Sequence, residues 1–568
     1  MKKLLITFIL AIVANIVFAQ QTTPNAPGET VIRNKAFEKM PEHPLAPAEY
    51  RRPKDYVPTL YKMNLAQISE KYSADTIKRG RKAYNELLKV NENGKWKPNG
   101  KSIDEHKCPE WFEDLKFGIF IDWGLWSIAS WAPKRENGAM YPDWYELRMY
   151  SNYTNKSHFW GFRNYHIKNW GEDFKRDHFI PLFQAKKFDA EKLIELFKDA
   201  GAKYVVPFNK HHSGFCLWDC SYSLRDTVDM GPRRDIVKEI VDACAKNSLK
   251  FGFYFSLTEW EYPVLDKDGK MQNFSWGQLK PYSPEMEYNA SGKIAVNDYV
   301  KEYLIPQAME FINKYSPDIM WYDGEWGVRA KELGCYELSA YYYNINEGKK
   351  EVAINDRYGI GEPDEIAGQF TKRKRNWLRT IRGDFFTDEF GDTSERIDPA
   401  KHHAWEACRG ISQSYGNNWQ DNATNVLSAK EFISMFVDMV ARGGNLLLLV
   451  NLDGQGAIPE VQKQRLLDIG SWLKKYGKAI YSTRIVAPFA TKEVAYTQSK
   501  DGKTVYAIIK NPKAKNVLKV SPKANSNIVE ISKNKNLAWE KADGKIIVNL
   551  PEEFIVDNLP VAVEIQVK

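Results

Sequence analysis

The sequence predicts an α/β protein in which a (β/α)8-like barrel is followed by a small C-terminal antiparallel β-sandwich. Between residues 106 and 485, short apolar runs alternate with amphipathic helical segments, a pattern typical of parallel βα units. The number of these units over this span favours a closed barrel over a single open sheet. After residue 486 the pattern changes to short alternating runs separated by turn signals, which is typical of an antiparallel sandwich.

Seven apolar runs are predicted as barrel strands. They are Lys116–Asp122, Lys203–Phe208, Phe251–Ser256, Ile319–Asp323, Val352–Asn355, Asp384–Thr387 and Asn445–Val450. Helices are expected at Leu60–Val90, Ala190–Ala200 and Arg234–Cys244, where apolar residues recur at helical spacing. Strands of the C-terminal sandwich are expected at Thr504–Ile509, Asn516–Val520 and Ile546–Leu550.

The chain of 568 residues is too long for one compact core, so several regions are expected. The predicted division is a signal peptide at 1–19, a leader and helical segment at 20–105, the barrel at 106–485 and the sandwich at 486–568.

The N-terminus has the three parts of a secretory signal. A basic start is followed by the apolar stretch Leu4–Phe18, and Ala19 supplies the small residue before a cleavage site. The apolar stretch is short for a membrane span. We therefore expect an exported protein, periplasmic or secreted, with no membrane partner.

Polar side chains directly follow several predicted strands. Asp122 ends the first strand, His211 and His212 follow the second, and Asp323 and Glu389 follow two later ones. In a barrel of parallel strands these positions meet at one mouth, where active sites lie. A mouth with paired carboxylates, imidazoles and many aromatics has the composition of a glycoside hydrolase site. The alternative for Asp323 alone is a helix N-cap.

Composition argues against other partners and cofactors. The six cysteines match no zinc pattern, and the adjacent side chains of His211 and His212 diverge, so we expect neither a metal nor another cofactor. The formal net charge of +8 is spread over a long chain without a nucleic-acid reader motif, and the basic cluster Lys372–Arg375 is expected to be a solvated loop. With 18 Trp and 30 Tyr, the chain has many faces on which sugar rings could stack, and a glycan is the expected partner. The sequence leaves the oligomeric state open.

Several motifs, in the same order along the chain, resemble those of one enzyme family. They are Trp111–Gly124, Asp143–Tyr145, Ala202–Val206, Lys210–Trp218, Val228–Asp235, Trp321–Trp326, Ile354–Arg357, Trp405–Glu406 and Gly443–Leu447. Together they make the chain similar to the α-L-fucosidases of glycoside hydrolase family 29, over roughly residues 108 to 490.

The resemblance implies a retaining glycoside hydrolase that releases a terminal α-L-fucose, or a related L-sugar, from glycans. Asp323 matches the nucleophile that forms a covalent glycosyl intermediate. Glu389 is the predicted acid/base, with Glu406 as the alternative; a supporting structural role is the other interpretation of Glu406. The expected substrate-binding residues are Asp122, Trp123, Asp143, Trp144, Tyr145, His211, His212, Trp218, Tyr254, Trp321, Glu406 and Trp419.

The chain departs from the family pattern at three of these motifs. Asp122 replaces the usual His of the opening His-Trp-Gly, Ser213 replaces an Asp, and Asp143 replaces a Glu. We expect Asp122 to be a shorter, anionic acceptor that changes what the pocket can bind. One hypothesis is an α-L-galactosidase that acts on algal, including sulfated, galactan. The other is a carbohydrate-binding relative that has lost catalysis.

Overall fold

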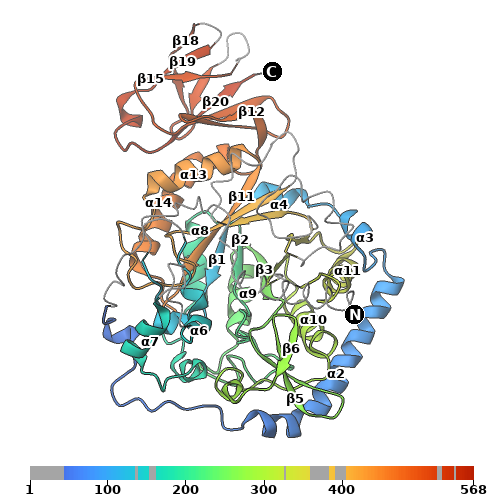
Figure 1. Cartoon of the computed structure of the whole chain (residues 1–568). Helices are drawn as coiled ribbons and strands as arrows, with labels where there is room; N and C mark the ends of the chain where they lie inside the picture. The colour runs from blue at the N-terminus through green and yellow to red at the C-terminus, as the bar shows by residue number, and fades with distance from the viewer. Residues whose placement is uncertain are drawn as a thin grey trace, which may run out of the picture.

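The protein is described from a computed structural model of the whole chain (Figure 1). The structure describes residues 44–134, 139–151, 161–324, 328–357, 383–389, 404–520, 527–542 and 545–567. The expected signal peptide, the basic cluster 372–375 and residues 325–326 of the Trp321–Trp326 motif lie outside these ranges.

Eight parallel strands form the central sheet, and they follow one another around it in chain order. A parallel bridge between Asn355 and Phe385 joins the two end strands, so the sheet closes into a barrel. The strands are β1 (Phe117–Asp122), β2 (Tyr204–Pro207), β3 (Lys250–Ser256), β7 (Ile319–Asp323), β8 (Ala353–Ile354), β9 (Phe386–Glu389), β10 (Trp405–Gly410) and β11 (Gly444–Asn451).

The seven predicted strands are all present, and an eighth was missed. Every residue of β1 and β11 is buried, because strands of a parallel sheet are covered on both faces and are apolar throughout. The missed strand, β10, is also buried but contains Glu406 and Arg409, and these charges hid it from a search for apolar runs.

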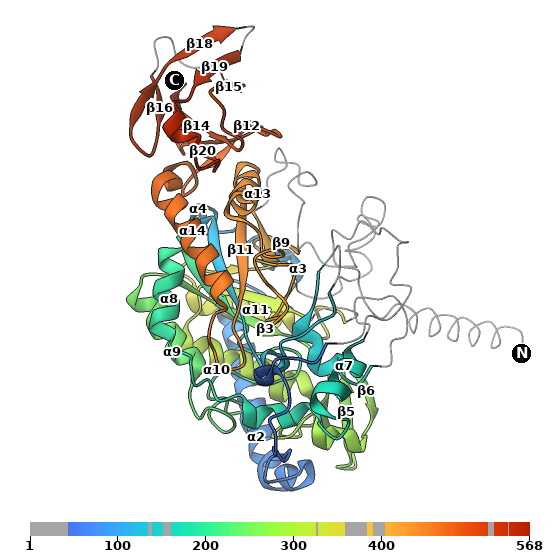
Figure 2. The ribbon, with the colours of Figure 1, turned by 90° about the vertical axis from the view of Figure 1, so that its left-hand side faces the viewer.

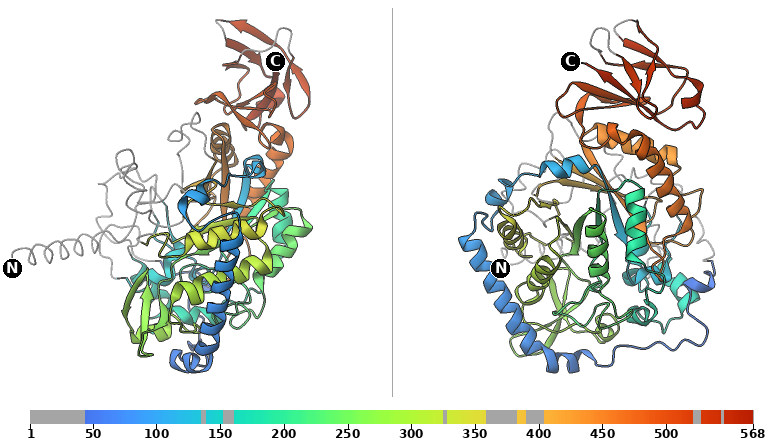
Figure 3. Two further views of the ribbon diagram at one scale, coloured as in Figure 1. Left: turned by 90° about the vertical axis from the view of Figure 1, so that its right-hand side faces the viewer. Right: turned by 180° about the vertical axis from the view of Figure 1, so that it is seen from behind.

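Helices pack around the barrel (Figures 1 and 3). They are α8 (Ala190–Asp199), α9 (Ile236–Lys246), α10 (Ile305–Tyr315), α11 (Cys335–Asn346), α13 (Ala429–Ala441) and α14 (Glu460–Tyr476). The expected helices 190–200 and 234–244 correspond to α8 and α9. Asp189 and Asp235 cap these two helices by accepting backbone N–H groups at the first turn.

The long helix α2 (Leu65–Asn93) runs along the outside of the barrel, where Leu60–Val90 was predicted to be helical (Figure 1). At Gly80 it approaches the backbone of η5 (Tyr299–Leu304) so closely that a Cβ would lie 2.3 Å from the carbonyl oxygen of Glu302. Among the described residues, no helix is both long and apolar enough to cross a membrane.

Two excursions from the barrel contribute to its mouth. The segment after β1 contains η2 (Pro142–Trp144), α6 (Tyr145–Arg148) and α7 (Phe162–Trp170). The segment after β3 forms a small antiparallel sheet of β4 (Tyr262–Leu265), β5 (Met271–Ser275) and β6 (Gln278–Pro281). Figure 2 shows α7, β5 and β6 on the same side of the barrel.

The C-terminal region consists of antiparallel sheets of six and three strands, which agrees with the predicted fold class. Their strands are β12 (Arg484–Ala490), β13 (Val494–Gln498), β14 (Thr504–Ile509), β15 (Lys515–Leu518), β16 (Ile528–Glu530), β17 (Lys535–Leu537), β18 (Trp539–Ala542), β19 (Lys545–Asn549) and β20 (Val561–Gln566). These sheets lie against α13 and α14 (Figures 1 and 3). One hydrophobic core includes residues of both the barrel and the sheets.

Candidate active site

The ends of four strands bring polar side chains together at the mouth of the barrel. Asp122 ends β1, Asp323 ends β7 and Glu389 ends β9, while Tyr254 lies two residues from the end of β3. In the parallel register Ser256 pairs with Asp323, so the ends of β3 and β7 are level. This is the C-terminal face of the barrel, where the reactive groups of such folds lie.

Asp323 is held as a carboxylate. Its Oδ2 accepts a hydrogen bond of 2.7 Å from the hydroxyl of Tyr254, and its Oδ1 accepts one of 2.7 Å from Nη1 of Arg357. His212 Nε2 lies 3.7 Å from Oδ2. Burial alone would raise the pKa of Asp323, but the Arg357 guanidinium, with His212 and Tyr254, outweighs burial and holds this pKa well below its usual range. Asp323 is therefore ionised at neutral pH.

Arg357 joins the two predicted catalytic carboxylates. While Nη1 donates to Asp323, Nη2 donates to Oε1 of Glu389, so one guanidinium contacts both groups. Nε donates to Thr387 Oγ1 at 3.1 Å, and the Thr387 hydroxyl donates to Asp356 Oδ1 at 2.6 Å. Arg357 lies within the predicted motif Ile354–Arg357, but no role was assigned to it from sequence. The sequence feature that could have pointed to Arg357 is its place at the end of a motif that begins on a predicted strand.

Glu406 lies inside the barrel on β10 and is fully buried. Trp321 Nε1 donates to its Oε1 at 2.9 Å, and the Tyr204 hydroxyl donates to its Oε2 at 2.5 Å. Burial raises the pKa of Glu406 to about 7, although these two hydrogen bonds and Arg357 oppose the shift. Both oxygens are thus engaged in the interior, whereas the side chain of Glu389 is 19% exposed at the mouth.

A second group of polar side chains lies beside Asp323. His211 Nε2 is 3.7 Å from Asp143 Oδ2, and Trp126 Nε1 donates to Asp122 Oδ1 at 2.8 Å. Asp122 Oδ2, Asp143 Oδ1 and His211 Nδ1 are buried without a hydrogen-bond partner in the described structure. Because unpaired buried polar atoms are costly, these three atoms are candidates for contact with a ligand.

Asp122 differs from the anionic acceptor that we expected. Burial raises its pKa to about 8, despite the opposing hydrogen bonds from Trp126 and Gly416. Burial also raises the pKa of Asp143 well above its usual value, and the negative charges of Asp122, Asp323 and Glu389 add to this shift. Burial, reinforced by His212, lowers the pKa of His211 well below its usual value. With this raised pKa, Asp122 can carry a proton at neutral pH and act as a hydrogen-bond donor, which an ionised carboxylate cannot do.

Four of the predicted substrate-binding side chains make their contacts away from this cluster. Trp123 packs against Phe183 and Phe188, and Trp218 packs against Phe253 and Phe311. The Tyr145 hydroxyl contacts His166. The Trp419 indole donates to the Tyr165 hydroxyl. Trp123 and Tyr145 each follow a residue of the site, and successive side chains on an extended or tightly turned backbone diverge. Trp321 lies under the site, with the Arg357 guanidinium 4.7 Å from the centre of its ring.

The loop that carries His211 and His212 rests on a buried ionic group. Lys210 Nζ is 3.1 Å from Glu259 Oε1, and Lys293 Nζ is 2.5 Å from Glu259 Oε2. Lys210 is fully buried, and its charge is paired with that of Glu259. The His212 ring is fixed by a 2.8 Å hydrogen bond between Nδ1 and the carbonyl oxygen of Thr258. This bond directs Nε2 toward Asp323.

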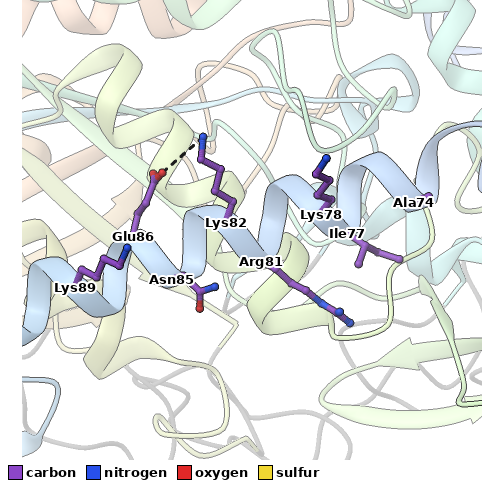
Figure 4. Close-up of a pocket in the computed structure, with 8 residues that line it drawn as sticks. All are labelled: Ala74, Ile77, Lys78, Arg81, Lys82, Asn85, Glu86 and Lys89. Carbon is purple, nitrogen blue, oxygen red and sulfur yellow. Dashed lines mark ion pairs between the residues drawn. The ribbon is translucent and has the colours of Figure 1, made fainter.

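A hollow on the outer surface lies apart from the Asp323 cluster and is lined by different residues. It runs along α2 and is lined by side chains of that helix alone, including Lys78, Arg81 and Lys82 (Figure 4). Lys82 and Glu86 form an ion pair of 4.0 Å there. No part of the Asp323 cluster contributes to it, so we do not place the active site there. Within the described ranges, no group of three or more His, Cys, Asp or Glu side chains is arranged to hold a metal ion.

Comparisons with known proteins show the family to which the chain belongs. The family model described as Alpha-L-fucosidase matches residues 84–478. The chain is 31% identical over 468 residues to plasma alpha-L-fucosidase of Homo sapiens, covering 80% of this chain and 88% of that protein. It is 30% identical over 474 residues to an alpha-L-fucosidase of Dictyostelium discoideum, covering 82% and 91%.

A solved structure gives the same result. The chain resembles the crystal structure of Thermotoga maritima alpha-fucosidase in complex with a mechanism-based inhibitor, with a TM-score of 0.65 and 30% identity. The match covers 83% of this chain and all of that one. A barrel with a carboxylate pair at its mouth, the family model and these relatives lead to one conclusion: the chain belongs to the alpha-L-fucosidase family of glycoside hydrolases, family 29.

Proposed function

We propose that this protein is an exo-acting, retaining α-L-fucosidase in which Asp323 is the nucleophile and Glu389 is the acid/base. The observation that carries the proposal is the Arg357 guanidinium, which contacts both carboxylates and so keeps them close together. A retaining glycosidase needs its two carboxyl groups only about 5–5.5 Å apart, with no room for a water molecule between them.

The reaction runs in two displacements. In the first, Asp323 Oδ attacks the anomeric carbon while protonated Glu389 gives its proton to the glycosidic oxygen, so that the aglycone leaves as an alcohol and a fucosyl–aspartate ester forms. In the second, Glu389 removes a proton from water, whose oxygen attacks the same carbon and releases Asp323. Two inversions leave the α-configuration unchanged. Tyr254 and Arg357 stabilise the Asp323 carboxylate both before attack and as it leaves.

The remaining polar atoms support an exo-acting site. Asp122 Oδ2, Asp143 Oδ1 and His211 Nδ1 are buried beside Asp323 and are suited to the hydroxyl groups of a terminal sugar. Two of these three residues are where the chain departs from the family pattern, so they are the positions at which sugar specificity would differ. The unpaired Oδ2 of Asp122 would suit a hydroxyl that fucose lacks, so α-L-galactose is the second candidate substrate.

Azide rescue tests the assignment of both carboxylates. Asp323→Gly should lose activity on 4-nitrophenyl α-L-fucoside by several orders of magnitude, and azide should restore turnover with a β-L-fucosyl azide product. Glu389→Ala should be rescued to give the α-azide, because the covalent intermediate still forms. Glu406→Ala is the matched comparison, and an α-azide from that variant instead would transfer the acid/base role to Glu406.

Sugar specificity is tested at Asp122. The wild type and Asp122→His are compared on 4-nitrophenyl α-L-fucoside and α-L-galactoside. If Asp122 serves an extra hydroxyl, Asp122→His raises the ratio of kcat/KM for fucoside over galactoside by tenfold or more. An unchanged ratio removes the galactoside candidate. A wild type that binds fucose but hydrolyses neither glycoside would indicate the inactive relative.

We also infer that the chain is exported, because residues 1–19 have the pattern of a signal peptide. N-terminal sequencing of the mature protein should begin at Gln20. A mature protein that retains Met1 would exclude export by this signal.

A further inference from the structure

We propose that Trp276 and Trp144 form a stacking platform for the aglycone, namely the sugar ring next to the scissile bond. This inference rests on the proposed function, because the platform would serve a substrate cleaved at Asp323. Trp276 was not singled out from the sequence, and it lies outside the barrel strands at the tip of the β5–β6 hairpin.

The position of Trp276 places an aromatic ring next to the reacting groups. Its ring centre lies 5.5 Å from that of His212, whose Nε2 is 3.7 Å from Asp323 Oδ2. The indole of Trp144 stacks beside that of Trp276, with ring centres 6.0 Å apart and an angle of 14° between their planes. Both tryptophans are half-buried. Two nearly parallel, partly exposed indoles therefore extend the site outward from His212.

The hairpin holds this platform in a fixed position. Phe274 on β5 stacks on Tyr299 of η5, with ring centres 4.4 Å apart. At the tip, a Cβ on Gly277 would lie 2.4 Å from Cγ2 of Val328, so the turn packs against the segment that follows β7. The backbone N–H of Trp276 also donates to the carbonyl oxygen of Glu259, at 3.4 Å. The hairpin tip is thus packed against segments that follow β3 and β7, the strands that supply Tyr254 and Asp323.

The local backbone does not favour a tryptophan at this turn. Ser275 pairs with Gln278, which leaves Trp276 and Gly277 as a two-residue turn with φ values of 52° and 73°. Turns of this type favour Asn, Asp or Gly at the first position, and bulky residues rarely adopt a positive φ. A bulky side chain kept in a disfavoured conformation at the edge of a site points to a function for that side chain.

The chemical class of the ligand follows from the two indole faces. The π-face of an aromatic ring is electronegative and apolar, and it pairs with the C–H groups on one face of a pyranose. A platform beyond the nucleophile would therefore bind a hexopyranose such as galactose or N-acetylglucosamine, to which the terminal sugar is attached. The hairpin would determine which glycans are cleaved rather than which terminal sugar is removed.

Trp276→Asn separates this role from a structural one. Asn is favoured at the first position of the turn, so the variant should be at least as stable as the wild type in thermal unfolding. Hydrolysis is measured with α-L-fucosyl fluoride, which has no aglycone ring, and with α-L-fucosyl disaccharides that carry galactose or N-acetylglucosamine. The ratio of kcat/KM for disaccharide over fluoride should fall at least tenfold in Trp276→Asn, and Trp276→Phe should retain most of it. Leu279→Ala, in the exposed strand of the same hairpin, is the matched control and should leave the ratio unchanged.

Each other outcome has a definite meaning. An equal loss on both substrates, or a large loss of stability, would overturn the platform in favour of a structural role for Trp276. An unchanged ratio, or a wild type that cleaves the fluoride but no disaccharide, would also overturn it. If the wild type releases no fluoride, the proposed function itself fails, and that result is distinct from a failure of the platform.

Discussion

At the scale of single residues, Arg357 links the two carboxylates that we propose as nucleophile and acid/base. Its side chain is 1% exposed, donates to both carboxylates and donates through Nε to Thr387. Burial raises the pKa of Asp323, and Arg357, His212 and Tyr254 lower it. If the charge of Arg357 is removed, only His212 and Tyr254 remain to oppose the effect of burial.

Arg357→Met should therefore lower kcat/KM on an aryl α-L-fucoside at least a hundredfold. It should also move the acidic limb of the pH profile to higher pH, because Asp323 must be ionised to attack and its pKa rises when the cation is lost. The pH dependence of kcat/KM checks this expectation. Arg79→Met, on the exposed side of α2, is the control for loss of one positive charge. An acidic limb that stays in place would show that Arg357 does not set the ionisation of Asp323.

Glu406 gives a second residue-level prediction, on stability. Its pKa is about 7 in the folded protein and ordinarily about 4.5, so between these pH values the folded state keeps a proton that the unfolded state has lost. Stability from this group is fully present below pH 4.5 and is lost as the pH rises toward 7, by an amount on the order of 3 kcal/mol.

Glu406→Gln removes this titration and keeps an amide in contact with Trp321 and Tyr204. The difference in free energy of unfolding between the variant and the wild type should grow in favour of the variant from pH 4.5 to pH 7. Denaturant unfolding at several pH values measures it. A difference that is constant with pH would contradict a raised pKa for Glu406.

At the scale of the elements, the turn after β7 sets the position of His212 relative to Asp323, the proposed nucleophile. Gly324 has φ of 79°, and a Cβ there would lie 2.6 Å from Cε1 of His212 and 3.1 Å from Oγ1 of Thr258. Thr258 in turn donates to the carbonyl oxygen of Gly324 at 2.7 Å, which ties the ends of β3 and β7 together.

Gly324→Ala should displace His212 and reduce kcat at least tenfold on the aryl fucoside. Gly269→Ala is a matched control, because Gly269 has a similar φ of 75° but open space around it. Both variants carry the same kind of backbone strain, which costs about 1 kcal/mol of stability, and Gly324→Ala should lose more because its Cβ also displaces His212. Equal activities of the two variants would show that the position of His212 is not critical.

At the scale of the whole molecule, the C-terminal sheets are joined to the barrel by buried contacts. Trp472 on α14 is 2% exposed and donates through Nε1 to the carbonyl oxygen of Pro560 at 2.7 Å. Lys510, the residue after β14, contacts Asp438 on α13 at 2.8 Å. The boundary at residue 486 stays a prediction, but these contacts lead us to expect that the two regions support each other.

Trp472→Ala should therefore destabilise the protein by about 3–5 kcal/mol, because it removes a large buried side chain and leaves a cavity. We expect fucosidase activity and the circular dichroism of the sheets to be lost at the same denaturant concentration. Leu467→Ala, on the exposed side of the same helix, should change stability little. Loss of the sheet signal while activity persists would show that the barrel is stable without the C-terminal region.

The sequence by itself determined the barrel, the C-terminal sheets and the strand ends at which polar side chains cluster. It could do so because apolar periodicity and strand-end position are local properties of the chain. It also placed Asp323 and Glu389 on two strands that the barrel brings to one face. It missed β10, whose charges are tolerated only because Tyr204 and Trp321 satisfy Glu406 in the interior.

Only the tertiary structure decided which side chains meet. Arg357 spans the two carboxylates because β7, β8 and β9 are neighbours in the closed barrel, and Trp276 reaches His212 because the hairpin after β3 folds back over the mouth. Trp123, Tyr145 and Trp218 were expected at the site, yet their rings make their contacts in the surrounding core. The direction of a side chain and its distant neighbours depend on barrel closure and loop packing, and these are properties of the folded chain rather than of any one segment.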